Sequence, residues 1–155
     1  MKTKKDFFIP GNDPGYMVHY LDTQLKIGLQ RAFNAKGFSF TAVQFGILSL
    51  LWQKEGLHQS ELAKKAGKDR HNMTRLLNLL EKGGYIQRKP DSIDKRRYNI
   101  FLTELGRSLQ DKLTPITVDF LEKALSGLSL KDLQQLRRLH EHIISNLENL
   151  NDNYL

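Results

Sequence analysis

Cysteine is absent from the 155 residues, which excludes disulfide bonds, thiolate metal ligands and thiol-based redox sensing. Apolar runs long enough to cross a membrane are also absent. The basic N-terminus has only three consecutive apolar residues, Phe7, Phe8 and Ile9, before Pro10. That run is too short for the apolar core of a signal peptide. These absences predict a cytoplasmic protein.

The motifs of common enzyme classes are missing as well. The chain has no P-loop, no dinucleotide-binding fingerprint and no nucleophile elbow. His140 and His142 are two positions apart on a predicted helix, where they point to different faces and cannot bind one ion together. We therefore predict no enzyme activity, cofactor or metal site. A metal-responsive protein, with ligands assembled from two chains, is the alternative.

Positive charge is what the chain has in excess. Its 24 Lys and Arg residues outnumber 17 Asp and Glu residues, giving a net charge of +7 and an isoelectric point near 9.6. Such a surplus favours a polyanionic partner. Solubility alone is the competing explanation, so the position of the charges has to decide.

Hydrophobic periodicity predicts a mainly α-helical chain with one small β-hairpin. Apolar residues recur at helical spacing in six segments, and capping residues such as Asp13, Thr41, Asp69 and Ser129 precede four of them. Two alternating segments, 85–89 and 98–102, predict strands on either side of a charged tip. The predicted helices cover about 14–34, 41–55, 59–66, 70–82, 104–120 and 129–150.

The fourth predicted helix has the clearest functional pattern. Its apolar stripe is opposite a polar stripe that is rich in hydrogen-bond donors. A major groove admits one helix, where arginine can pair with guanine and asparagine with adenine. The short helix and the turn at Gly67 before it complete a helix-turn-helix pattern. An ordinary solvated face is the competing interpretation. The predicted DNA contacts are Lys68, Arg70, His71, Asn72, Thr74, Arg75 and Asn78.

The hairpin tip is a second basic element. Arginine inserted into a narrow minor groove gains from the concentrated negative potential there. Asp94 stands two residues before Arg96 and is predicted to hold its guanidinium in a bidentate pair. A solvated hairpin with an incidental ion pair is the competing interpretation. The predicted DNA-binding residues of the hairpin are Arg88, Asp94, Lys95, Arg96 and Arg97.

The outer helices have more apolar surface than one chain can cover. Apolar residues in the last predicted helix alternate at spacings of three and four, which is typical of packing against another helix. We therefore predict a homodimer, with an intrachain hairpin of the last two helices as the alternative.

The order of these motifs resembles the multiple-antibiotic-resistance regulator (MarR) family of bacterial winged helix-turn-helix transcription regulators. The resemblance spans about the middle third of the chain, and the outer helices agree in arrangement rather than in motif. The segments that carry it are Glu61-Leu62-Ala63, Asp69, Met73-Thr74-Arg75-Leu76-Leu77, Leu80 to Arg88, Asp94-Lys95-Arg96-Arg97 and Leu102 to Gly106.

The resemblance implies a single domain over 1–155 that acts as a homodimer on double-stranded DNA, with a pseudo-palindromic operator and the expected role of a repressor. It implies an N-terminal arm at 1–12, dimerisation helices at 13–35 and 104–150, and a winged helix-turn-helix unit at 41–103. Arg96 would enter the minor groove with the support of Asp94. His71 departs from the small hydroxyl residues common at its position.

Effector pockets in the resembling family lie where the dimerisation helices meet the DNA-binding unit. Our candidate lining residues are Tyr16, His19, Tyr20 and Phe45. Aromatic walls with one polar group suit a small aromatic or anionic effector. The alternative is that these aromatics are plain core and that the chain is an architectural DNA-binding protein without an effector.

Overall fold

The computed structural model describes residue 11 and residues 13–154, with side chains to residue 150. The predicted N-terminal arm at 1–12 therefore lies outside the described residues, except for Gly11. Two compact units are distinguished, residues 1–120 and residues 121–155, and their boundary falls within a helix. Each unit is described by itself below.

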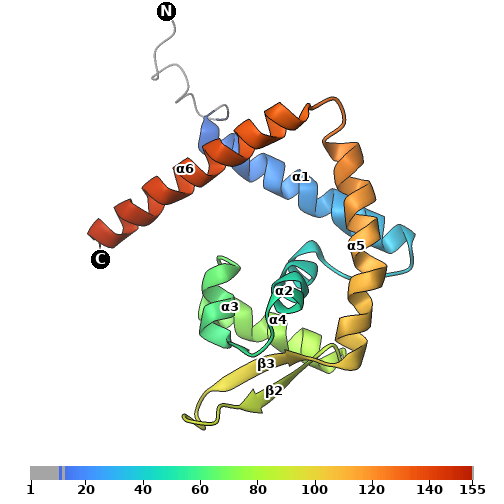
Figure 1. The fold of residues 1–155 in the computed structure, drawn as a ribbon, viewed down its shortest axis with the longest axis vertical. Helices are drawn as coiled ribbons and strands as arrows, with labels where there is room; N and C mark the ends of the chain where they lie inside the picture. The colour runs from blue at the N-terminus through green and yellow to red at the C-terminus, as the bar shows by residue number, and fades with distance from the viewer. Residues whose placement is uncertain (1–10, 12, 155) are drawn as a thin grey trace, which may run out of the picture. The chain divides into compact units, whose positions relative to one another are not determined.

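The first unit holds most of the helices and the sheet (Figure 1). The prediction of a mainly α-helical chain with a β-hairpin wing is confirmed. Helix boundaries agree with the sequence to within a few residues. The elements are α1 (Pro14–Ala35), α2 (Ala42–Gln53), β1 (Leu57–His58), α3 (Gln59–Lys65), α4 (Arg70–Lys82), β2 (Ile86–Pro90), β3 (Tyr98–Leu102) and the greater part of α5 (Glu104–Ala124).

Side-chain caps fix the starts of these helices. The Asp13 carboxylate accepts from Tyr16 N at 3.0 Å at the start of α1. Thr41 Oγ1 accepts from Gln44 N, and Gln44 Oε1 accepts in return from Thr41 N, so the predicted capping box of α2 is confirmed. Each such bond satisfies a backbone group that the first turn of a helix leaves unpaired.

The sheet has three antiparallel strands in the order β1-β3-β2, one more than predicted. The second helix was expected to run to about residue 55, but Lys54 is already extended, with φ −154° and ψ 116°. Gly56 N then donates to Ile100 O at 2.9 Å, and Leu57 pairs with Ile100. A two-residue strand has no detectable alternation, so sequence periodicity missed it.

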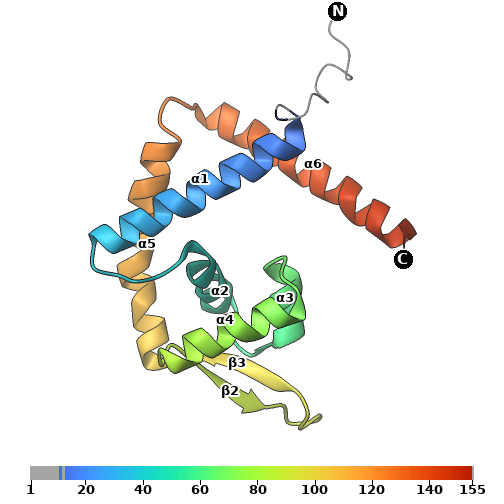
Figure 2. The ribbon, with the colours of Figure 1, turned by 180° about the vertical axis from the view of Figure 1, so that it is seen from behind.

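The core lies where α2, α3 and α4 pack against the inner face of the sheet (Figure 2). The predicted inward stripe of α4 is confirmed, because Met73, Leu77 and Leu80 are fully buried and Leu76 is nearly so. Gly67, with φ +58°, provides the predicted turn between α3 and α4. The core therefore fixes which face of α4 is left for solvent.

Three contacts attach the start of α5 to the rest of this unit. Trp52 Nε1 donates to Gly106 O at 3.0 Å, and the Glu55 carboxylate accepts from Arg107 Nε and Nη2 at 2.8 Å each. The second Glu55 oxygen also accepts from Leu102 N. The Arg107 hydrogen bond is the main cause that lowers the pKa of Glu55. The end of α2, the end of β3 and the start of α5 thus share one carboxylate.

The second unit contains the end of α5 and helix α6 (Leu130–Tyr154). The predicted cap is confirmed, since Ser129 Oγ accepts from Asp132 N at 3.2 Å and Ser129 N donates to Asp132 Oδ2 at 2.9 Å. Among the α6 residues with described side chains, none is buried. Leu130 and Ile144 are exposed, and the exposed apolar residues at spacings of three and four are Leu136, Leu139, Ile143, Leu147 and Leu150.

A glycine pair tests how tightly α5 is fitted. A Cβ at Gly106 would lie 2.0 Å from the Tyr85 carbonyl oxygen, whereas one at Gly46 on α2 would meet nothing within 4 Å. Gly106→Ala should lower the free energy of unfolding by about 1–3 kcal/mol, as overpacking does. Gly46→Ala should raise it by about 0.5–1 kcal/mol. Urea unfolding measures both, and equal effects of the two variants would contradict the tight fit.

Candidate nucleic-acid interface

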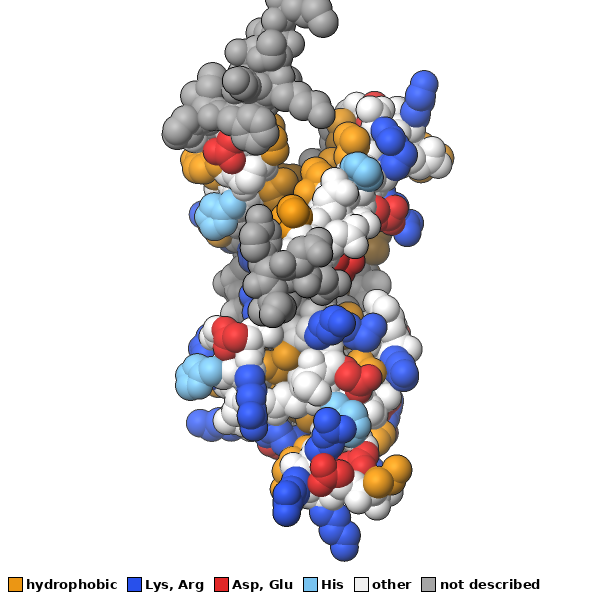
Figure 3. Space-filling view, turned by 90° about the vertical axis from the view of Figure 1, so that its left-hand side faces the viewer, with side chains coloured by type: hydrophobic (Ala, Val, Ile, Leu, Met, Phe, Trp, Pro, Cys, Tyr) orange, Lys and Arg blue, Asp and Glu red, His pale blue; other side chains and the backbone are white. Residues whose placement is uncertain are grey.

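Nearly all of the surplus charge lies in the winged unit, residues 41–103. This segment has 12 Lys and Arg residues and 6 Asp and Glu residues, so it holds +6 of the total +7. Figure 3 shows Lys and Arg side chains spread over the face that presents α3 and the hairpin. The charge is therefore concentrated on the elements that the sequence assigned to DNA.

Asp69 positions the outward face of α4. Its carboxylate accepts from Asn72 N at 2.8 Å and also from the Asn72 side-chain amide, and the backbone bond is the largest cause that lowers the pKa of Asp69. The amide expected to read adenine is thus turned back onto the cap. Thr74 is engaged too, because its hydroxyl donates to Arg70 O and accepts from Gln59 Nε2. Both residues hold the helix in place before any ligand arrives.

Arg88 is likewise occupied within the chain. Its guanidinium pairs with Glu81 and donates to Asn78 Oδ1 at 2.8 Å, and its side chain is only 18% exposed. Arg88 therefore ties β2 to the end of α4. A DNA contact by Arg88 or Asn78 stays a prediction, and the structure assigns both residues an intrachain role.

Several cations of the helix-turn-helix and the hairpin surround one hollow. It has a volume of about 780 Å³ and lies between α3, α4 and the hairpin. Five cations line it and no acidic residue does. Lys64 was missed by the sequence analysis, although it is one of the two exposed cations, with Lys65, of the first helix of the helix-turn-helix. The five are Lys64, Lys68, Arg70, Arg96 and Arg97.

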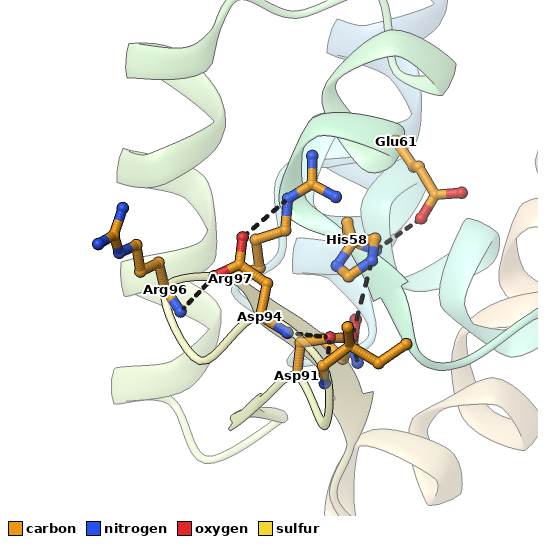
Figure 4. Close-up of polar contacts among 8 residues, drawn as sticks. His58, Glu61, Asp91, Asp94, Arg96 and Arg97 are labelled. Atoms are coloured by element: carbon orange, nitrogen blue, oxygen red, sulfur yellow. Dashed lines mark hydrogen bonds and ion pairs between the residues drawn. The ribbon is translucent and has the colours of Figure 1, made fainter.

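Two aspartates shape the hairpin tip (Figure 4). Asp91 Oδ1 accepts from Ile93 N and Asp94 N at 2.9 Å each, and Asp91 Oδ2 accepts from Asn99 Nδ2 at 3.0 Å. The backbone bonds are the largest causes that lower the pKa of Asp91 to about 2. Asp94 Oδ1 accepts from Arg96 N at 3.0 Å. Aspartates that bind amides two or three residues on are typical of turns.

The predicted pair between Asp94 and the Arg96 guanidinium is wrong in its geometry. Asp94 holds the backbone N–H of Arg96, and its other oxygen lies 4.0 Å from Arg97 Nε. Figure 4 shows the Arg96 guanidinium pointing away from Asp94. The Asp94 carboxylate reaches the backbone amide two residues later more readily than the end of the long Arg96 side chain. The local turn bond therefore forms in place of the guanidinium pair.

His58 connects the hairpin to the helix-turn-helix. Its backbone N–H donates to Glu61 Oε2 at 2.8 Å, and its Nε2 lies 3.9 Å from Asp91 Oδ2. His58 stands at the cap position of α3, where a histidine is atypical. Its partner Asp91 was missed, although an Asp at the first position of the hairpin loop is a usable turn signal.

The four predicted effector residues do not surround one cavity. Tyr16 and Tyr20 stack with centroids 6.2 Å apart and are exposed, on the same part of α1 as His19. Phe45 is instead partly buried and packs on Phe33 and Trp52 against the core. Since Phe33 is 13 residues after Tyr20, the two sites are about 20 Å apart along the helix. Phe45 therefore has a packing role, and effector binding stays a prediction.

A second hollow of about 390 Å³ lies on the outer surface of α4. His71 and Arg75, four residues apart on one face, line it together with Lys82. His71, Arg75 and Lys82 are all exposed. Contacts of His71 and Arg75 with base edges stay a prediction.

Comparison with known proteins agrees with this geometry. The MarR family model matches residues 40–98, which is nearly the whole winged unit. The transcriptional regulator TtmR of Methylorubrum extorquens is 31% identical over 81% of this chain, which spans 66% of the length of TtmR. An HTH-type transcriptional regulator of Bacillus cereus is 33% identical to this chain. The match covers 69% of this chain and 74% of the length of that regulator.

The chain belongs to the MarR family. Its relatives are transcription regulators rather than enzymes. The structure of a MepR–DNA complex from S. aureus aligns with a TM-score of 0.76 at 26% identity, over 86% of this chain and 97% of that one. The winged helix-turn-helix fold that the sequence predicted is thus that of the MarR proteins.

Among the residues that the structure describes, 11 and 13–154, no three His, Asp or Glu side chains lie close enough to hold a metal ion together. No helix of the same part is both long and apolar enough to span a bilayer.

Asp91 provides a pH prediction for the wing. Its pKa in the folded chain is about 2, below the ordinary 3.8, so its charged form stabilises the fold above the unfolded pKa. That stabilisation should be lost as pH falls from about 4 to about 2. Thermal unfolding of the wild type and of Asp91→Asn should therefore differ at pH 6 and converge near pH 2. A difference that persists unchanged at low pH would contradict this role of the carboxylate.

Proposed function

We propose that this MarR-family chain is a sequence-specific regulator, with the role of a repressor, that binds a pseudo-palindromic operator as a homodimer in the cytoplasm. The observation that carries the proposal is the juxtaposition of the exposed cations of α4 and the wing around one hollow free of acidic residues. The S. aureus relative whose structure is a DNA complex supports the same kind of partner.

The two basic elements serve different parts of the duplex. An α-helix fits a major groove, so Arg75 and His71 on the outer face of α4 read base edges there. The wing bears Arg96 on a tip shaped by turn bonds, and a cation on such a narrow projection suits the minor groove. The hollow between them is lined by cations suited to the intervening phosphates.

Dimerisation is supported by apolar surface at both ends of the chain. On α1 the exposed set includes Tyr16, Met17, Tyr20 and Leu21, and on α6 it runs from Leu136 to Leu150. Exposed apolar stripes of this length mark helix–helix interfaces. Two chains related by a two-fold axis present two recognition helices, which matches half-sites about one helical turn apart.

The interface can be tested on α6. Leu136→Asp with Ile143→Asp buries two charges in the proposed interface, which should give monomers that no longer bind the operator tightly. Gln135→Asp with His142→Asp places the same charges at the same seven-residue spacing on exposed polar positions, and it should leave a dimer. Sedimentation velocity measures both. A dimeric Leu136 and Ile143 variant with normal affinity would exclude this helix from the interface.

The two reading elements can be separated by arginine removal. Arg75→Ala should flatten the preference at one position of each half-site, at a cost of about 1–3 kcal/mol, in selection from random DNA. Arg96→Ala should weaken binding to all duplexes and make the salt dependence shallower.

Asp94→Ala and Lys36→Ala complete that series. Asp94→Ala should resemble Arg96→Ala in milder form, because it frees the Arg96 backbone, although it removes a negative charge. Lys36→Ala removes a cation from the end of α1 and should change base preference at no position. Tighter binding by Asp94→Ala at every salt concentration would refute the positioning role of Asp94.

A further inference from the structure

The wing tip carries an apolar side chain that no intrachain contact explains. Ile93 is 94% exposed, more than any other large apolar side chain among the described residues. It lies in an otherwise polar loop, directly before Asp94, Lys95, Arg96 and Arg97. A single exposed apolar residue is ordinary on a protein surface, so its exposure alone means little. The way Ile93 is held and the residues that surround it are more informative than its exposure.

The backbone at Ile93 is fixed. Ile93 N donates to Asp91 Oδ1 at 2.9 Å, and the same oxygen accepts from Asp94 N. Asp91 is itself held by Asn99 on β3 and faces His58 at the start of α3. The isoleucine is therefore projected from a bonded turn, and its branched side chain has little rotamer freedom to lose on binding.

The residues around Ile93 indicate what kind of surface could cover it. Three consecutive cations follow within four residues, so a surface that covers Ile93 must also accept positive charge. A DNA minor groove does both, because phosphates line its edges and its walls and floor offer apolar sugar and base atoms. Minor-groove proteins insert isoleucine and similar wedges between base steps beside such cations.

We propose that Ile93 is a specificity-determining wedge that enters the minor groove beside Arg96 and partly unstacks a base step there. This inference rests on the proposed function and names what the wing reads. Pyrimidine–purine steps unstack most easily, so the wing should favour them over A-tracts at the flanks of each half-site. An anionic membrane surface would also accept a basic tip with an apolar end, but the shared cationic hollow with α4 favours DNA.

The test compares Ile93→Ser and Ile93→Met on operators selected by the wild type. 2-Aminopurine is placed in turn at each flanking step, since its fluorescence rises on unstacking. Ile93→Ser should lose about tenfold in affinity, the worth of burying part of an isoleucine, and should lose both the fluorescence rise and the flank preference. Its salt dependence should equal that of the wild type, because no phosphate contact is removed. Ile93→Met should retain all of these properties.

Ser92→Ala is the matched control at the adjacent exposed position and should behave as the wild type. Equal affinity, flank preference and fluorescence for Ile93→Ser and the wild type would overturn the wedge while leaving the proposed function intact. Failure of the wild type to bind any duplex would remove the proposed function instead. Binding to phosphatidylserine vesicles that Ile93→Ser abolishes, with DNA binding unchanged, would assign the tip to a membrane and would also overturn the proposal.

Discussion

The Glu55 carboxylate is the contact on which the geometry of the reading surface depends. One side chain accepts from Leu102 at the end of β3 and from Arg107 at the start of α5, while Glu55 itself follows α2. The wing strands therefore cannot shift without disturbing the helix that leads toward the outer part of the chain. The close approach of Gly106 to Tyr85 allows this arrangement, since any side chain at position 106 would push α5 away from the base of the wing.

The polar face of α4 has two kinds of side chain: some bond to other residues of the chain, and others are left exposed. The side chains of Asn72, Thr74 and Asn78 make bonds within the chain, Asn78 to Arg88 on β2, whereas Arg75 and His71 remain exposed. Side chains pinned by neighbours give the helix a defined position, so that the others reach a groove with little reorganisation. Such preorganisation lowers the entropy that binding would otherwise cost.

Much of this fold was accessible from sequence, because caps and apolar spacing act over a few residues. The capping box at Thr41, the inward stripe ending at Leu80 and the turn at Gly67 all follow from such local rules. The strand at Leu57 was missed, because its only cause is a long-range pairing with Ile100. The sequence indicated which polar and basic residues form the candidate site, but not which atoms they contact within the chain. Spacing alone did not reveal that Asp94 would bind an amide or that Phe45 would pack against the core.

The hairpin tip turns without a glycine. No residue between 85 and 103 adopts a positive φ angle, so no glycine is required there. The turn is built by the side chains of Asp91 and Asp94 acting on neighbouring amides. The side chains of Asp91 and Asp94 thus hold the turn in its conformation. No such role falls to the side chains of Ser92, Ile93 and Lys95. Related regulators can therefore differ at these three positions while they keep the same turn. Such differences change the chemistry that the tip presents to DNA.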